Sequence, residues 1–355
     1  MKGHKAGRHV TIRDVARAAG VSVSTVSATV NNTDYVSAEM RARVEAVVRR
    51  FHYRPNDLAR GLRLQRTHTI AVVVPDLSNS FYTEMVQGMK DYASAANYTL
   101  LIGDSRERSD EERKYLDTFH RRRVDGVIRI PPIDDPADGV GSVLGNIPVV
   151  YADRFLRLRK SDAGCVGVNN AEAAFDATRY LLSLGHRRIA IIVGPRTVHT
   201  AAERLQGYSR ALRGSRVSRR RDLVRTGDNQ MLGGHREAIE LLTRPDRPTA
   251  IFCTNNMMTL GAFQAIQELK LHCPKDVSLL GFDDFHWATL LRPRITMVRQ
   301  PAREIGMSAA RALIDFIDGR NGLKSEQSLS TTLMVRESCC PPSLEAQGGG
   351  RRARR

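Results

Sequence analysis

The stretch TIRDVARAAGVSVSTVS, residues 11–27, decides the fold of the N-terminal part of this chain. Thr11 and Asp14 have the spacing of a capping box, in which a hydroxyl and a carboxylate three residues later begin a helix. Gly20 supplies a left-handed stop, and Ser22 can cap a second helix. This order predicts a helix-turn-helix, whose second helix lies in the major groove of DNA. An ordinary helical hairpin is the alternative.

A third helix is expected to begin after Ser37 and to end near Phe51, because apolar residues recur there at helical spacing. Pro55 breaks this pattern. Residues 57–64 then predict a short helix with one apolar side, and residues 65–68 are typical of a linker. The first part of the chain is therefore expected to be entirely helical.

From residue 69 the pattern changes, because short apolar runs now alternate with amphipathic stretches. The runs that predict strands are 70–75, 98–103, 124–130, 148–151, 189–193, 249–253 and 277–281. Helices are expected at 81–96, 171–184 and 256–269, among others. This alternation favours parallel sheets with helices on both faces. The strands are too many for one compact sheet, so we expect two α/β lobes with a ligand in the cleft at the carboxyl ends of the strands.

The charge of the chain is strongly basic and unevenly placed. It has 55 Lys and Arg against 38 Asp and Glu, a formal net charge of +17. Residues 1–66 hold 13 of the basic and 5 of the acidic residues, and residues 351–355 add four arginines. Such a distribution favours a polyanionic partner, nucleic acid first, at the N-terminal part. A generally basic proteome or a solubility device is the alternative.

Several classes of protein are disfavoured. The cysteines are Cys165, Cys253, Cys273, Cys339 and Cys340. No Cys-x-x-Cys spacing appears, so we expect no metal site and no redox pair, and the odd count argues against a disulfide framework. We expect no cofactor. Neither a secretory signal nor a run of about 18 apolar residues is visible, so a soluble cytoplasmic protein is expected. No dinucleotide, phosphate-loop or nucleophile-elbow motif appears, so an enzyme is not expected.

An ordered series of motifs resembles the lactose-repressor/galactose-repressor (LacI/GalR) family of transcriptional regulators. The resemblance begins with residues 11–27 and extends from about residue 10 to residue 342. Further motifs that carry it are residues 35–37, 53–56, 74–79, 123–126, 184–189, 281–284 and 298–301. It implies an N-terminal all-α helix-turn-helix headpiece with a hinge helix, followed by an α/β two-lobe periplasmic-binding-protein-like domain.

We expect a headpiece at 1–54, a hinge helix and linker at 55–68, a two-lobe effector-binding and dimerisation domain at 69–340, and a disordered basic tail at 341–355. The resemblance implies a homodimer that binds a near-palindromic double-stranded DNA operator. It also implies that the hinge helix enters the minor groove, with Leu62 as the wedge between central base pairs. Ordinary helix packing is the alternative for Leu62.

The residues that the motifs place on DNA are Thr11, Ser22, Val23, Ser24, Thr25, Ser27, Ala28, Asn31, Tyr53, Asn56, Ala59 and Leu62. Val23 and Ser24 match base-reading positions, and both are short. Ala28 stands where the family usually has an arginine that would bind guanine. Because alanine donates no hydrogen bond from its side chain, we expect an operator that differs from the usual family consensus. The basic arm at residues 2–9 is expected to compensate through phosphate or minor-groove contacts.

The resemblance also implies a small-molecule effector, with a sugar as the expected class. Its expected ligands are Asp76, Ser78, Asn79, Phe81, Tyr82, Asp153, Arg204, Asn229, Asn255 and Asp283. Asn255 lies in Thr254-Asn255-Asn256, where the family usually shows Ala-Asn-Asp. Asn229 stands where some sugar-responsive relatives have an aromatic stacking residue, and Trp287 is an alternative for that role.

The mechanism expected from this resemblance has two states. In one, the hinge helices of two subunits form and the operator is bound; in the other, ligand changes lobe closure, the hinges melt and affinity falls. Two rival functions stay open. One is a sugar-binding receptor of the transport type, and the other is a DNA-architectural dimer that has no small-molecule effector.

Overall fold

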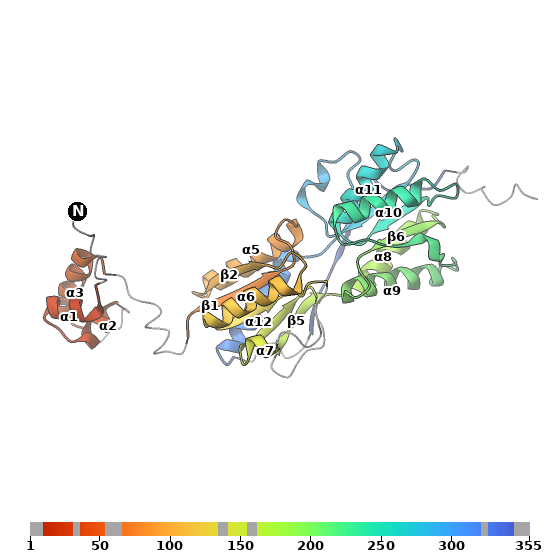
Figure 1. Cartoon of the computed structure of the whole chain (residues 1–355). Coiled ribbons are helices and arrows are strands. Elements are labelled where there is room, and N and C mark those ends of the chain that lie inside the picture. The colour runs from red at the N-terminus through yellow and green to blue at the C-terminus, as the bar shows by residue number, and fades with distance from the viewer. Residues whose placement is uncertain are drawn as a thin grey trace, which may run out of the picture. The chain divides into compact units, whose positions relative to one another are not determined.

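The computed structural model describes residues 10–30, 36–53, 66–133, 141–154, 162–320 and 326–343. The chain divides into two compact units, Met1–Thr67 and His68–Arg355. The first unit is the helical headpiece, and the second contains both sheets (Figure 1). The hinge helix expected within residues 55–64 and the basic tail expected after residue 340 lie mostly or wholly outside the described residues.

The headpiece consists of α1 (Ile12–Ala19), α2 (Val23–Val30) and α3 (Ala38–Phe51). The predicted capping box is confirmed, since Thr11 and Asp14 satisfy each other's backbone N–H groups. Gly20 ends α1 with a φ of 65°, a left-handed conformation that glycine adopts without strain. Val15, Ala16, Ala19, Val26 and Val44 are buried and form the small core. The three helices therefore begin and end where the sequence predicted.

The second unit is built from two sheets of six strands, one in each lobe (Figure 1). Lobe 1 has the strand order β11-β5-β4-β3-β1-β2. Its strands are β1 (Thr69–Val74), β2 (Thr99–Asp104), β3 (Gly126–Arg129), β4 (Val149–Ala152), β5 (Asp162–Val168) and β11 (Glu326–Leu329). Its helices are α5 (Ser80–Ala95), α6 (Ser109–Arg121), α7 (Gly141–Leu144) and α12 (Ala302–Ile317). All pairings within this sheet are parallel.

Lobe 2 has the order β12-β10-β9-β8-β6-β7, and only its edge pairing of β10 with β12 is antiparallel among the described strands. The strands are β6 (Ile189–Val193), β7 (Val224–Thr226), β8 (Ala250–Cys253), β9 (Ser278–Phe282), β10 (Thr296–Arg299) and β12 (Thr332–Met334). The helices are α8 (Asn170–Ser183), α9 (His199–Gly214), α10 (Met231–Leu242) and α11 (Asn256–Glu268), with the short helices η1 (Arg221–Leu223) and η2 (His286–Thr289).

The chain crosses between the lobes three times, after β5, after β10 and after β11. The seven strands predicted from apolar runs are all present, shifted by no more than a few residues. Strands β5, β7, β10, β11 and β12 were not predicted, nor was the path of the chain late in the sequence. Helix α12 and strand β11 return to lobe 1 late in the sequence, and β12 then pairs at the edge of lobe 2. The lobes are therefore hinged by three connections, which bring distant parts of the chain to the cleft.

Helices cover both faces of each sheet. In lobe 1, α5 and α12 pack on one face and α6 and α7 on the other. In lobe 2, α8 and α9 share a core on one face, and α10 and α11 share the core on the other. The backbones of α5 and α12 approach so closely that only glycine fits at two positions. A Cβ at Gly88 would lie 2.0 Å from the carbonyl oxygen of Arg303, and one at Gly306 would lie 1.9 Å from that of Met85. This contact fixes α5, whose first turn carries side chains into the cleft.

Among the residues that the structure describes, no helix combines the length and the apolar character needed to cross a membrane.

Candidate functional site

Helix α2 presents short, uncharged side chains to solvent. Val23 is 42% exposed, and Ser22 and Ser24 beside it are exposed as well. The hydroxyl oxygen of Ser22 lies 2.6 Å from that of Ser24 and 2.9 Å from that of Thr25. The start of the helix therefore offers hydroxyls and a small apolar group to base edges, and no guanidinium.

The remaining positions predicted to contact DNA differ in placement. Ser27 and Ala28 are partly exposed on α2. Tyr53 packs against the headpiece core, and its partial burial raises the pKa of its hydroxyl. Thr11 donates its hydroxyl to Oδ2 of Asp14 at 2.6 Å, so that this group serves the start of α1. The other positions, Asn31, Asn56, Ala59 and Leu62, lie outside the described residues.

Sequence reasoning missed Arg43, which ties α3 to the turn of the helix-turn-helix. Its Nη2 donates to the carbonyl oxygen of Ala19 at 2.6 Å and to that of Gly20 at 3.4 Å. These carbonyls end α1 and have no partner within that helix. Because α2 begins only three residues later, Arg43 positions the helix that would enter the major groove. The sequence did not reveal this role, because an arginine in a basic headpiece is normally interpreted as a contact to phosphate.

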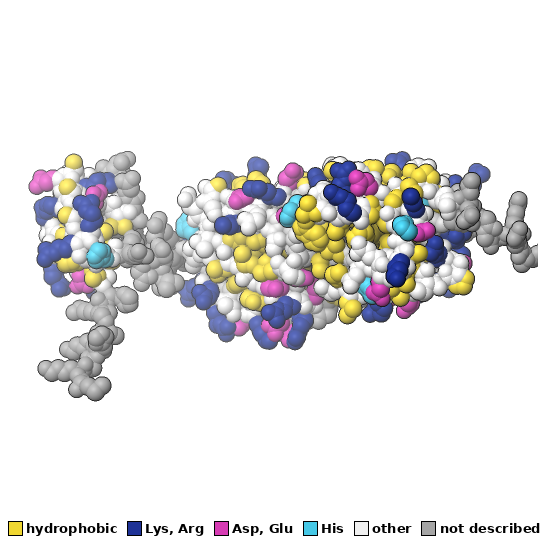
Figure 2. All heavy atoms as spheres, turned by 90° about the horizontal axis from the view of Figure 1, so that it is seen from above, with side chains coloured by type: hydrophobic (Ala, Val, Ile, Leu, Met, Phe, Trp, Pro, Cys, Tyr) yellow, Lys and Arg dark blue, Asp and Glu magenta, His cyan; other side chains and the backbone are white. Residues whose placement is uncertain are grey.

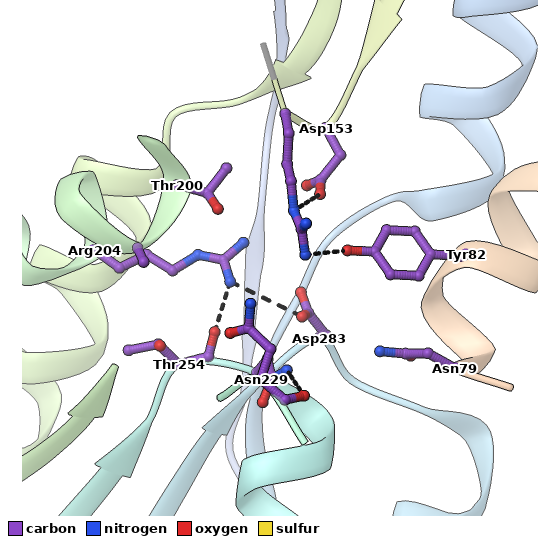
Figure 3. A pocket seen from close by; sticks show the side chains of 11 residues that line it. Asn79, Tyr82, Asp153, Thr200, Arg204, Asn229, Thr254 and Asp283 are labelled. Carbon is purple, nitrogen blue, oxygen red and sulfur yellow. Dashed lines mark hydrogen bonds and ion pairs between the residues drawn. The ribbon is translucent and has the colours of Figure 1, made fainter. Parts of the chain in front are cut away.

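A polar pocket lies between the lobes (Figure 3). Seven of the ten predicted ligand residues line it: Asn79, Tyr82, Asp153, Arg204, Asn229, Asn255 and Asp283. Arg154, Thr200, Ala201 and Thr254 also line it and were not predicted. Asn79, Tyr82, Asp153 and Arg154 come from lobe 1, and the others from lobe 2, so a ligand here would contact both lobes at once.

The lobe 2 side of the pocket is organised around Arg204 on α9, which is buried. Its Nε donates to Oδ1 of Asn170 at 2.8 Å and its Nη1 to the carbonyl oxygen of Thr254 at 2.6 Å. The guanidinium lies over the ring of Phe282 at 3.9 Å and points toward the carboxylate of Asp283, also at 3.9 Å (Figure 3). These contacts hold the guanidinium in one place, ready for an oxygen of a ligand.

Asp283 follows strand β9 with a φ of 66° and is 5% exposed. Its Oδ1 accepts a hydrogen bond from Nε2 of Gln300 at 2.6 Å. Burial raises the pKa of the Asp283 carboxyl, and the charges of Arg204 and Arg154 partly offset that shift. The side chain therefore faces the pocket with one oxygen held by the crossover after β10.

The lobe 1 side contains a second buried acid, Asp153, beside Arg154. The guanidinium of Arg154 donates to both carboxylate oxygens of Glu107 at 2.8 Å and to the hydroxyl of Tyr82 at 2.8 Å. Burial raises the pKa of Asp153 to about 6, against the pull of Arg204 and Arg154. Oδ1 of Asp153 is buried and has no hydrogen-bond partner among the residues that the structure describes. A buried acceptor without a partner costs free energy, so a donor from a ligand would stabilise it.

Two amides complete the wall in lobe 2. Asn255 caps α11, accepting from Met258 N at 2.8 Å, and its Nδ2 donates to the carbonyl oxygen of Asn229 at 2.8 Å. Asn229 has a φ of 64°, and its side chain takes the space that a Cβ at Gly194 would fill. The position that carries an aromatic residue in some relatives thus presents an amide here.

Three predicted residues and one alternative lie away from the lining. Oδ1 of Asp76 accepts from the backbone N and the hydroxyl of Ser78, so these two residues shape the turn before α5. Phe81 is 5% exposed in the core of lobe 1, with its ring edge-on to Tyr82. Trp287 is partly buried against the core of lobe 2, with its ring centroid 4.2 Å from that of Phe285. None of these four residues lines the pocket.

The lining is therefore almost wholly polar, with Ala201 as its one small apolar side chain. It combines two acids, two guanidiniums, hydroxyls and amides, which suits a small ligand rich in hydroxyl groups. Among the described residues, no group of three or more His, Cys, Asp or Glu is arranged to hold a metal ion.

Comparisons with known proteins agree with this architecture. Residues 11–56 match the model of bacterial regulatory proteins of the lacI family, and residues 178–339 match that of a periplasmic binding protein-like domain. The chain is 33% identical to the HTH-type transcriptional repressor CytR of Escherichia coli K12 over 339 residues, which cover 95% of this chain and 98% of that protein. It is also 33% identical to the ribose operon repressor of the same strain, with coverage of 92% and 99%.

Solved structures show the same arrangement. The lac repressor dimer bound to operator and the anti-inducer ONPF matches with a TM-score of 0.83 and 27% identity, over 94% of this chain and all of that chain. The complex of the transcriptional regulator CelR with cellobiose matches with a TM-score of 0.71 and 32% identity, over 93% of this chain and 99% of that one.

Proposed function

Because the chain belongs to the LacI family of bacterial regulatory proteins, we propose that it is a transcriptional repressor controlled by a sugar or similar polyol bound between its lobes. The family and the two-part fold are those that the sequence motifs predicted. The relatives are DNA-binding regulators, which confirms the prediction that the chain is not an enzyme. The observation that carries the effector is the buried Oδ1 of Asp153, which has no hydrogen-bond partner among the described residues and belongs to a side chain that lines a pocket built from both lobes.

A homodimer on a near-palindromic operator follows from this function. The lac repressor match is a dimer bound to operator. In this chain, lobe 2 exposes large apolar side chains, with Leu290 76%, Leu232 73% and Met231 38% exposed. Figure 2 shows apolar side chains gathered over one face of this lobe. Because monomeric proteins rarely leave a large apolar patch in water, this face supports pairing of two copies. We place the action of the dimer in the cytoplasm, where bacterial DNA lies.

The effector acts by changing the lobes. A polyol in the pocket would donate one hydroxyl to Oδ1 of Asp153 in lobe 1 and accept from the guanidinium of Arg204 in lobe 2. Such a ligand favours one degree of lobe closure over another, and it shifts DNA affinity only by its differential affinity for the two states. We propose that the hinge segments at residues 55–68 transmit this change in the lobes to the DNA-binding headpiece.

A DNA-architectural dimer without an effector is the second candidate, since α2 lacks a charged base-reading side chain and Arg154 already occupies part of the cleft. Selection of bound sites from random DNA, followed by footprinting with and without sugars, separates the two functions. A defined site whose protection changes with one sugar supports the regulator. Binding without sequence preference, unaffected by every sugar, nucleoside and polyol, would leave the architectural function.

A further inference from the structure

The edge of lobe 2 that lies opposite the pocket is formed by four loops, each leading from a helix into the next parallel strand. They are residues 184–188, 215–220, 243–249 and 269–277. Because β6, β7, β8 and β9 are parallel, their first residues meet at this edge while their last residues face the pocket. Hydrogen bonds join the loops, as Nε of Arg188 donates to the carbonyl oxygen of Arg247 at 3.2 Å. We call these loops, with Arg213 and Arg221 at their borders, the basic edge.

The basic edge exposes cations that form no ion pair with a carboxylate of the described residues. Arg187, Arg216, Arg219, Arg221 and Lys275 are all exposed. None of them has a carboxylate from a described residue within ion-pair distance, and Arg219 donates only to the hydroxyl of Ser209. The loops are therefore rich in guanidiniums that keep their full charge toward solvent.

The few acids of the basic edge are already occupied. Asp222 binds Arg220 and Arg244, with N–O distances of 2.7 Å and 2.5 Å, and Asp246 accepts from the same two arginines. A further acid, Asp276, lies 3.8 Å from Arg247. These acids pair with Arg220, Arg244 and Arg247, and none of them pairs with the five exposed cations named above.

Helix dipoles do not account for this charge. A cation is stabilised near a helix C-terminus only within about the last turn. Among the four helices that end at this edge, only α9 has a basic residue in its last turn, Arg213. The exposed cations lie in the loops beyond the helix ends, where the helix dipoles do not stabilise them. We therefore look for a partner of this charge outside the lobe.

We propose that the basic edge binds the phosphate backbone of duplex DNA, so that the repressor holds a second DNA segment besides its operator. The proposal rests on the proposed function, which keeps the protein on DNA and therefore among phosphates. Guanidiniums bind phosphate oxygens in a bidentate manner and read no sequence. The chain enters the second unit from the headpiece at His68, beside β1 of lobe 1, whereas the basic edge belongs to lobe 2 (Figure 1).

The test uses the full chain and two variants of equal charge. Arg216→Gln with Arg221→Gln removes two charges from the basic edge. Arg113→Gln with Lys114→Gln removes two charges from exposed positions of α6 in lobe 1. Each protein is loaded to saturation on an immobilised duplex selected from random DNA. A labelled second duplex without the selected sequence is then added, and its retention is measured between about 50 and 200 mM salt.

We expect the wild-type protein and the α6 variant to retain the second duplex equally. The basic-edge variant should retain about tenfold less, and its log–log salt slope should fall by about two, close to one per lost phosphate contact. Equal retention by both variants, or none by the wild type, would overturn the proposal. Competition by polyglutamate as strong as that by duplex would also overturn it, in favour of an acidic protein partner.

Elution salt from immobilised mixed-sequence duplex gives a second readout that needs no operator. The basic-edge variant should elute at lower salt than the α6 variant of equal charge, and elution at the same salt contradicts the proposal. If no sequence can be selected, the proposed function fails while this comparison still decides the basic edge.

Discussion

The side-chain amide of Asn256 in lobe 2 donates from Nδ2 to Oδ1 of Asn79 in lobe 1, at 2.8 Å. Both side chains are buried, and both belong to helix N-termini that face each other across the cleft. Their orientations are fixed, because Phe81 N donates to Oδ1 of Asn79 at 3.0 Å and Met257 N donates to Oδ1 of Asn256 at 2.8 Å. This hydrogen bond joins the lobes without any ligand.

Asn256→Asp should weaken lobe closure in the absence of ligand. The new carboxylate can still accept from Met257 N, but its second oxygen would oppose Oδ1 of Asn79. Loss of the donor and the unfavourable oxygen pair should cost the closed state about 1–3 kcal/mol. We expect a larger radius of gyration by small-angle X-ray scattering and faster amide hydrogen exchange in the first turns of α5 and α11.

Asn169→Asp is the matched control. Asn169 caps α8 by accepting from Glu172 N at 2.9 Å, and among the described residues it makes no side-chain bond to the other lobe. Both changes place a negative charge at a helix N-terminus, which the helix dipole favours. Asn169 is exposed, so Asn169→Asp should not lower the melting temperature, whereas the buried carboxylate of Asn256→Asp should lower it. An equal expansion of both variants would show that charge alone, and not the lost interlobe bond, opens the cleft.

Asp153 should make the unliganded protein less stable as the pH rises. Burial raises its folded-state pKa from 3.8 to about 6, so the folded state binds more protons than the unfolded chain within this window. The free energy of unfolding therefore has its full value with respect to Asp153 below pH 3.8, where the acid is protonated in both states. It falls as the pH rises through 6, by about 3 kcal/mol in all at 1.36 kcal/mol per pKa unit.

Asp153→Asn isolates this effect, because the amide imitates the protonated acid. We expect the variant to be more stable than wild type at pH 7.5, by up to about 3 kcal/mol, and to gain little at pH 4. Ligand affinity should fall, because the amide oxygen is a weaker acceptor than the carboxylate. Urea unfolding at both pH values and titration with the effector measure the two outcomes. A difference in stability that does not change with pH would contradict the assignment of the shift to Asp153.

Much of the fold could be predicted because its signals are local. Thr11, Gly20 and Ser22 mark the helix-turn-helix by capping chemistry alone, and the apolar runs located seven strands of the two sheets. The return of α12 to lobe 1 was not predictable in this way, because it involves close backbone contacts of Gly88 in α5 with Arg303 in α12 and of Gly306 in α12 with Met85 in α5. The sequence around a glycine in a helix does not show which distant helix packs against it.

The pocket shows the same division. Residues in family motifs, such as Arg204 and Asp283, were predicted and line the pocket. Arg154 was missed although it follows Asp153 directly, because only the fold shows that Glu107 and Tyr82 hold its guanidinium inside the cleft. Phe81 was placed on the ligand by its position after Asn79, but the first turn of α5 directs its ring into the core.

Arg43 should matter for DNA binding by positioning rather than by direct contact. Arg43→Met removes the donor to the carbonyls of Ala19 and Gly20 and keeps much of the apolar stem. We expect affinity for a selected operator to fall by about 1–2 kcal/mol, since charged hydrogen bonds are worth about that much. Operator titrations over a range of salt measure both the affinity and its salt slope.

The slope separates the two roles of Arg43. A phosphate contact would lower the slope by about 0.9, whereas loss of positioning should leave it unchanged. Arg49→Met is the control, because the Arg49 side chain is 73% exposed and pairs only loosely with Glu45 at 3.6 Å. An affinity loss in Arg43→Met that comes with a reduced slope would mean that Arg43 contacts DNA itself.

Ala28→Arg should change the DNA sequence that the protein selects. Ala28 is partly exposed on α2, and the start of that helix offers only hydroxyls and an apolar group to bases. An arginine there can donate two hydrogen bonds to guanine, worth about 1–3 kcal/mol of discrimination. Selection from random DNA should therefore recover a new conserved guanine in each half-site. Ala18→Arg adds the same charge to an exposed position of α1 and should only strengthen binding to all sequences. An unchanged consensus for Ala28→Arg would mean that this part of α2 does not face the bases.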